Sequence, residues 1–156
     1  MRIAVIAAAA TIAFASAMVA AKPLTKAQAL AVMHERHEGM ETIVKANKSL
    51  RREIEGGSPD AMAVRLSAAQ IAQLSRKASR WFPAGTGPDV GKTGAKPEIW
   101  QKPQDFAAKL RNFQTAARLF QAAANAGDAN AIKGRYADLV RTCSACHDGY
   151  RMDMHH

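Results

Sequence analysis

Apolar residues recur every three or four positions through most of the chain, the spacing that places side chains on one face of an α-helix. No stretch shows the strict two-residue alternation of a half-buried strand. The fold class is therefore expected to be all-α. The pattern predicts four long helices, near residues 26–55, 59–81, 103–126 and 129–150. Their apolar stripes can be buried against one another, so we expect an antiparallel four-helix bundle.

Local start and stop signals bound these helices. Thr25-Lys26-Ala27-Gln28 is a capping box that opens the first helix, and Gly56-Gly57 ends it. Ser58-Pro59 predicts the N-cap and the first residue of the second helix. A long connection rich in Gly and Pro, residues 83–97, is expected to wrap one end of the bundle before a short helical turn at 97–100.

The predicted stripes of the first and last helices differ in content. In the first helix the stripe comprises Leu30, Met33, His37, Met40, Val44 and Ile54. In the last helix it comprises Ile132, Tyr136, Leu139, Cys143, Cys146 and Tyr150. The only two cysteines of the chain are therefore expected to face the interior of the bundle.

The two cysteines belong to the sequence Cys143-Ser144-Ala145-Cys146-His147. Positions i, i+3 and i+4 share one face of a helix, so both sulfurs and the imidazole point the same way. Cys-x-x-Cys-His is the attachment signature of a c-type haem. We expect Cys143 and Cys146 to form thioether bonds to one covalent haem c, and His147 to be the axial iron ligand.

Three other interpretations of the motif compete with this one. A disulfide between Cys143 and Cys146 would leave His147 without a role. A thioredoxin-like redox pair needs a βαβ setting, and no strand is predicted. A zinc site needs four ligands, and the other histidines (His34, His37, His155 and His156) show no partner spacing. The haem interpretation is favoured.

The N-terminus has the features of a signal peptide over residues 1–21. Met1-Arg2 is a basic start, an apolar stretch follows, and Val19-Ala20-Ala21 supplies small residues for cleavage before Lys22; Ala15-Ser16-Ala17 is a second candidate site. An uncleaved membrane anchor is the alternative. Export to the periplasm agrees with the haem motif, because c-type attachment takes place outside the bacterial cytoplasm. Residues 22–156 are then the mature bundle.

The chain is basic, with a formal net charge of +9 that falls by one when Arg2 is removed with the signal peptide. Such a charge favours acidic partner proteins or anionic surfaces. Nucleic acid is not expected as a partner of an exported chain, and along the sequence the basic residues are spread out. A simply solvated basic surface is the alternative.

The chain resembles the class II c-type cytochromes, the cytochrome c′ family, from about Ala27 to Met152. The resemblance is carried by Lys96-Pro97-Glu98-Ile99-Trp100, by Ala126-Gly127-Asp128, and by the terminal run from Cys143 to Arg151. The placement of the haem motif at the C-terminus separates this class from class I cytochromes c. The resemblance implies a four-helix bundle with one haem in its core.

The resemblance also implies roles for single residues. Arg151 matches the basic residue beside the proximal imidazole, with an ordinary solvated arginine as the alternative. Arg36-x-x-x-Met40 matches a first-helix pattern in which the arginine approaches a haem propionate; a surface ion pair is the alternative for Arg36. The residue at the Met40 position faces the distal side of the iron. Met40 is expected either as a sixth ligand or as a distal lid.

Other side chains near this pattern are weaker candidates. His37 would give bis-His ligation if it faced the iron. Trp81 and Phe82 could wall the distal pocket, although a plain core role is favoured for both. The pair His155-His156 is expected to be a tail rather than a metal site.

The expected function is electron transfer by Fe(II)/Fe(III) cycling in a periplasmic mono-haem cytochrome. The alternative is a five-coordinate haem protein that binds nitric oxide or carbon monoxide. An enzyme is not expected, because the sequence offers no distal acid–base pair. Redox proteins, acidic ones among them, are the expected partners, and the resemblance adds a homodimer as a further expectation.

Overall fold

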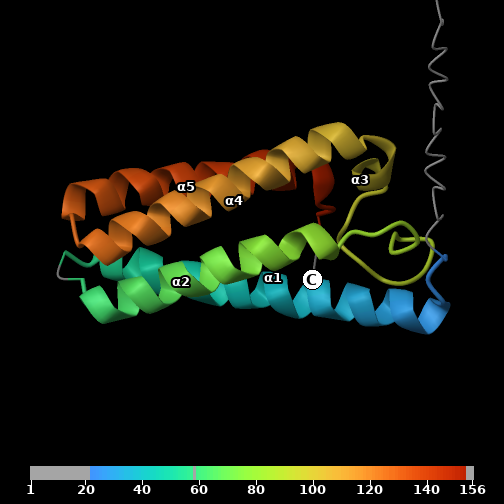
Figure 1. Ribbon diagram of the computed structural model, residues 1–156, viewed down its shortest axis with the longest axis horizontal. Helices are drawn as coiled ribbons and strands as arrows, with labels where there is room; N and C mark the ends of the chain where they lie inside the picture. Colours follow the sequence, from blue (N-terminus) through green and yellow to red (C-terminus); the bar gives the residue numbers. More distant parts are fainter. Residues whose placement is uncertain (1–21, 58, 154–156) are drawn as a thin grey trace, which may run out of the picture.

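The structure is a computed structural model that describes residues 22–57 and 59–153 (Figure 1). Its elements are α1 (Lys26–Glu55), α2 (Ala61–Lys77), a 3₁₀ turn η1 (Ala78–Arg80), α3 (Glu98–Gln101), α4 (Pro103–Ala126) and α5 (Ala129–Tyr150). The four long helices run alternately in opposite directions, with α1 and α2 forming one layer and α4 and α5 the other. The described residues contain no strand, so the all-α four-helix expectation is confirmed.

Two segments with predicted roles lie outside the described residues: the signal-peptide segment 1–21 and the pair His155-His156. None of the helices in residues 22–57 and 59–153 has both the length and the apolar character needed to cross a membrane.

The first helix begins where its capping box predicts. The Thr25 hydroxyl accepts a hydrogen bond from the Gln28 backbone N–H at 3.3 Å, and the Gln28 side chain accepts one from the Thr25 N–H at 2.9 Å. Helix α4 ends at Gly127, whose φ of 76° lies in the left-handed region that favours glycine. Asp128 then caps α5.

Helix α2 begins two residues later than predicted. Asp60, not Ser58, is its N-cap, because the Asp60 carboxylate accepts hydrogen bonds from the backbone N–H groups of Met62 and Ala63. The Asp60 N–H in turn donates to the Glu53 carboxylate at 2.9 Å. This bond across the turn holds Asp60 in the capping position; Ser58 itself lies outside the described residues.

The buried face of α1 is rotated from the stripe that the sequence predicts. It comprises Ala29, Met33, Arg36, Gly39, Ile43, Ala46 and Leu50. Leu30 and Val44 are about two-fifths exposed and His37 is exposed, so placing these three on the stripe was wrong. The physical reason is that Arg36 and Gly39, which a hydrophobic pattern counts as polar or neutral, occupy the centre of the buried face.

The core has two parts that meet at Phe82 and Leu110. The larger cluster is centred on Leu50, Ile71, Trp81, Phe120 and Leu139. The smaller cluster comprises Ala95, Ile99, Phe106 and Tyr150, with half-buried Cys146 packed against it. The smaller cluster surrounds the end of α5 that carries the Cys-x-x-Cys-His motif.

The connection between η1 and α3 is tied to the C-terminal end of the chain. The Lys96 N–H donates to the Tyr150 carbonyl at 2.9 Å, and the Met152 N–H donates to the Gly94 carbonyl at 2.8 Å. These bonds form an isolated antiparallel bridge between Ala95 and Arg151. The connection therefore lies beside the motif, as expected of a segment wrapping one end of the bundle.

Candidate cofactor site

The Cys-x-x-Cys-His motif lies in the last two turns of α5. Cys143 and Cys146 are both free and half-buried, and the Cys143 thiol donates a hydrogen bond to the Leu139 carbonyl at 3.4 Å. His147 is exposed. Leu139 and Tyr150, on the same face of α5, are buried, whereas the face is only partly covered by protein atoms at the two cysteines between them. The helix brings two sulfurs and one imidazole to one side, as its period requires.

The electrostatics of the motif keep both thiols protonated and the imidazole neutral. Burial raises the pKa of Cys143 and that of Cys146, the latter partly offset by the positive charge of Lys109. Partial desolvation by neighbouring protein atoms lowers the pKa of His147, and the positive charge of Arg151 lowers it further. A neutral imidazole has a free nitrogen lone pair, which is the form that binds a metal.

Arg36 is buried although it is charged: only 5% of its surface is exposed. Its guanidinium donates to the carbonyls of Trp81 and Thr86 and to the hydroxyls of Thr86 and Thr93, at 2.9–3.5 Å. The group also lies over the Phe82 ring, 5.1 Å from its centroid. Burial lowers the pKa of Arg36. The alternative of a surface ion pair for Arg36 is contradicted, because the side chain is inside the fold.

Arg36 has no carboxylate partner among the described residues. A buried guanidinium without a negative partner is costly, and it binds carboxylates well. Together with two half-buried thiols and a neutral imidazole, this donor set fits a covalently held porphyrin that carries carboxylates. The residues present therefore fit the cofactor that the motif implies.

Met40 lies one turn after Arg36 on α1 and is half-buried against the larger core cluster. Its neighbour Gly39 is needed for the packing here: a Cβ at Gly39 would lie 2.3 Å from the Trp81 ring. The indole therefore rests directly on the α1 backbone. The Trp81 Nε1–H donates to the Glu35 carboxylate at 3.2 Å, which fixes the ring in place. Trp81 is 1% exposed, so its core role is confirmed.

Tyr150 and Asp105 form a contact that sequence reasoning missed. The Tyr150 hydroxyl donates to the Asp105 carboxylate at 2.5 Å, and Tyr150 is 5% exposed. That hydrogen bond, followed by burial, raises the pKa of Tyr150 to about 12. The stripe placed Tyr150 inside the bundle, but no local signal pairs it with a residue 45 positions away. Arg151, which follows, is exposed, and its backbone N–H donates to the His147 carbonyl.

Tyr150 predicts a loss of stability at alkaline pH. The folded protein keeps this phenol protonated to a pKa of about 12, whereas the unfolded chain releases the proton from about pH 10. Its contribution is complete below pH 10 and is lost as the pH rises to about 12. Relative to Tyr150→Phe, the wild type should lose roughly 1 to 3 kcal/mol of unfolding free energy over that range, with screening by nearby water included. Denaturant unfolding from pH 9 to 12 measures the difference.

Tyr136→Phe is the matched control for this measurement. Burial also raises the pKa of Tyr136, but its hydroxyl makes a weak contact of 3.5 Å to the Asn47 carbonyl. The Tyr136→Phe protein should retain the part of the pH dependence that comes from Tyr150. Wild-type and Tyr150→Phe curves that stay parallel to pH 12 would show that the bond to Asp105 does not stabilise the protonated phenol.

A four-helix bundle with a Cys-x-x-Cys-His motif in the last turns of its last helix defines a class of helical c-type haem proteins. The chain belongs to the cytochrome c′ family: the sequence profile of Cytochrome C′ matches residues 31–151. Proteins of this family bind one covalent haem c.

Relatives with similar sequences include proteins named cytochrome c′ and cytochrome c-556. Cytochrome c′ of Alcaligenes xylosoxydans xylosoxydans is 34% identical over 99 residues, which cover 63% of this chain and 75% of the relative. Cytochrome c-556 of Agrobacterium tumefaciens is 35% identical over 123 residues, which cover 76% of this chain and 95% of the relative. The similarity to the second protein thus extends over nearly its whole length.

Solved structures share the fold. Cytochrome c′ from Thermochromatium tepidum superposes with a TM-score of 0.74 at 32% identity, covering 80% of this chain and 97% of that one. A nitric oxide complex of a mutant cytochrome c prime from Alcaligenes xylosoxidans gives 0.73 at 26% identity, covering 81% and 97%. Another cytochrome c′, described as showing ligand-controlled dimer dissociation, gives 0.74 at 26%, covering 85% and 100%.

Proposed function

We propose that this protein is a mono-haem electron carrier of the periplasm in which Met40 is the sixth iron ligand. The observation that carries the proposal is the place of Met40, half-buried in the core one turn after the buried Arg36 on the same helix. A thioether is an established axial ligand of haem iron in electron-transfer cytochromes. A methionine is also a common core residue, which is the alternative that the test below must exclude.

Five further residues have roles in this proposal. Cys143 and Cys146 would hold the cofactor by thioether bonds, and His147 would bind the iron from α5. Arg36 would bind a propionate, because its guanidinium is buried without a described carboxylate partner. Arg151 would lie beside the proximal imidazole, which agrees with the effect of its charge on the His147 pKa. The cofactor itself supplies a one-electron Fe(II)/Fe(III) couple.

The protein chain would then bind, orient and shield the cofactor without changing a bond in a substrate. We therefore propose a carrier and not an enzyme. Export by residues 1–21 and a mature domain of residues 22–156 complete the proposal, since covalent haem attachment takes place outside the bacterial cytoplasm.

The second candidate function is gas binding at an open sixth position. It is supported by the similar fold of the nitric oxide complex from Alcaligenes xylosoxidans. In that case Met40 would be a distal lid, and its thioether would pack beside the open position without binding the iron.

The spin state of the haem-loaded protein separates the two functions. We expect low-spin ferric and ferrous spectra, and no carbon monoxide complex within the time of mixing, because a bound thioether occupies the sixth position. High-spin iron that binds carbon monoxide on mixing would instead establish the gas-binding function. Electron paramagnetic resonance of the ferric form and optical spectra with and without carbon monoxide are sufficient.

A homodimer is also proposed, on the description of one structural neighbour as a dimer that dissociates under the control of a ligand. Sedimentation velocity over a range of protein concentrations tests it, and a single monomer mass at all concentrations would contradict it.

A further inference from the structure

Acidic residues are absent from two long segments of the chain. Residues 61–88 and residues 106–127 contain no Asp or Glu, although both contain several Arg and Lys. The first segment includes all of α2 and the second most of α4. All three ion pairs among the described residues lie in α1 and α5. Apart from Lys109, which lies one turn after Asp105, the basic side chains on α2 and α4 are therefore not offset by acidic neighbours on the same helix.

Helices α2 and α4 pack side by side, which brings these charges together. The Gln114 amide donates to the Ser75 carbonyl at 3.1 Å, and Arg65 Nε–H donates to the Ala124 carbonyl at 3.3 Å. Arg111 and Arg118 lie one turn before and one turn after Gln114, on the side of α4 that reaches α2. Arg76 is next to Ser75.

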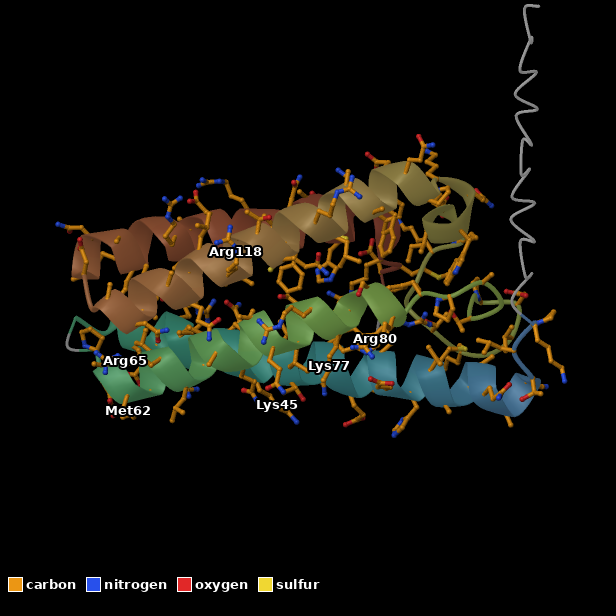
Figure 2. The ribbon with its side chains drawn as sticks, viewed as in Figure 1. Lys45, Met62, Arg65, Lys77, Arg80 and Arg118 are labelled. Atoms are coloured by element: carbon orange, nitrogen blue, oxygen red, sulfur yellow. The ribbon has the colours of Figure 1, made fainter. Side chains whose placement is uncertain are left out.

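We call the resulting surface the arginine seam. It comprises the exposed residues Arg65, Arg76, Arg80, Arg111 and Arg118. Figure 2 shows Arg65 on α2, Arg80 on the following turn η1 and Arg118 on α4, with Lys77 close to Arg80. The sequence places these residues up to 53 positions apart (Arg65 to Arg118), so they are spread out along the chain and gathered only by the fold.

The composition of the seam is that of a binding surface for carboxylates. The like charges of the seam repel one another. Neither α2 nor the part of α4 that follows Asp105 has an acidic side chain that could offset this repulsion. The guanidinium group binds a carboxylate through two parallel hydrogen bonds, which the ammonium group of lysine cannot do. The seam is also bordered by exposed apolar surface: Met62 and Leu66 of α2 are 59% and 63% exposed. Arginine and methionine are both enriched in protein interfaces.

We propose that the arginine seam is the docking surface for a redox partner protein whose own surface carries clustered Asp and Glu side chains. The proposal rests on the proposed electron-transfer function, because a carrier has to meet its partners through a reversible, electrostatically steered contact. The seam reaches the end of the bundle that holds the cofactor motif, since Arg80 lies two residues before Phe82, which packs against the same core cluster as Cys146.

A charge-reversal pair of variants tests the proposal in the haem-loaded protein. The seam variant is Arg76→Glu/Arg80→Glu/Arg118→Glu. The control variant, Lys26→Glu/Lys48→Glu/Lys133→Glu, changes the net charge equally at exposed positions of α1 and α5. Arg65 is left intact because it also bonds to α4. Circular dichroism melting first establishes that both variants are folded.

The probe is poly-L-glutamate, titrated at about 50 mM ionic strength, where the screening length exceeds about 10 Å. We expect the chemical shift changes of the protein's backbone amides to fall on α2 and α4. The seam variant should bind at least about tenfold more weakly than the wild type, and the control variant less than about threefold more weakly. Equal losses in the two variants, shift changes centred on α1 or α5, or no measurable binding would each overturn the proposal.

Vesicles of phosphatidylglycerol and phosphatidylcholine provide the comparison with a lipid surface. One contrary result is that the wild type binds these vesicles more tightly than poly-L-glutamate and that the seam variant loses this binding. This result would assign the seam to a membrane surface and overturn the proposal of a protein partner. None of these measurements depends on the ligands of the iron. The docking proposal and the electron-transfer proposal can therefore fail separately.

Discussion

A Cys143→Ala/Cys146→Ala protein, produced together with the haem-attachment machinery, is expected to contain no haem that survives denaturation. The two cysteines are the only ones in the chain, so no other thiol can form a thioether bond. Both thiols are free and half-buried on the face of α5 that also carries the buried Leu139 and Tyr150. Haem staining after denaturing electrophoresis, with mass spectrometry of the same band, measures the loss.

The same double variant should also be less stable. A cofactor that binds the folded state and not the unfolded chain adds its binding free energy to stability. Ser144→Ala is the control, because Ser144 lies between the cysteines but is exposed and leaves both thiols in place. Denaturant-resistant haem in the double variant would refute covalent attachment at these positions. An unchanged melting transition would refute a cofactor inside the core.

A Met40→Ala protein is expected to change from low-spin to largely high-spin iron and to bind carbon monoxide. The substitution removes the thioether that we propose as the sixth ligand, and alanine offers no replacement. If Met40 is only a lid, the spin state of the wild type will persist and gas binding will become faster. Optical spectra and stopped-flow mixing with carbon monoxide distinguish these outcomes.

Met33→Ala is the matched control for this experiment. Met33 is on the same helix and is 7% exposed, so its loss removes an equivalent side chain from the core. Core substitutions of this kind cost about 2 to 5 kcal/mol. The Met33→Ala protein should lose stability and keep its spectrum. A Met40→Ala protein with wild-type spectrum and wild-type gas kinetics would show that a different face of α1 lies toward the cofactor.

The parts of the fold that could be predicted from the sequence are those with local causes. The Thr25–Gln28 capping box and the Gly127 end of α4 each depend on residues within one turn of one another. The placement of Cys143 and Cys146 on one helix face likewise follows from the helical period alone. The number of long helices and the position of the motif follow from these signals.

The parts that could not be predicted depend on contacts between distant residues. Arg36 is polar, so a hydrophobic pattern places it outside, whereas its buried position depends on carbonyls and hydroxyls of residues 81–93. The bond between Tyr150 and Asp105 joins two helices. The arginine seam is a third case, because α2 and α4 must pack together before their charges form one surface.

The connection of residues 83–97 has a consequence for how the chain could be re-engineered. It is held from α1 by Arg36 and from the chain end by the bonds of Gly94 and Lys96 to residues 150–152. Residues inserted into this connection would move its hydrogen-bonding groups away from Arg36 and from residues 150–152. The turn at the opposite end is different, because the bond described across it, from the Asp60 N–H to the Glu53 carboxylate, is exposed to water.

Lengthening a flexible turn costs only about 0.6 kcal/mol for each doubling of its length. The bundle thus has one permissive end and one restrictive end. A tag, a linker or a new pair of chain termini belongs at the turn between α1 and α2, as far along the bundle as possible from the helix turns that carry Cys143 and His147.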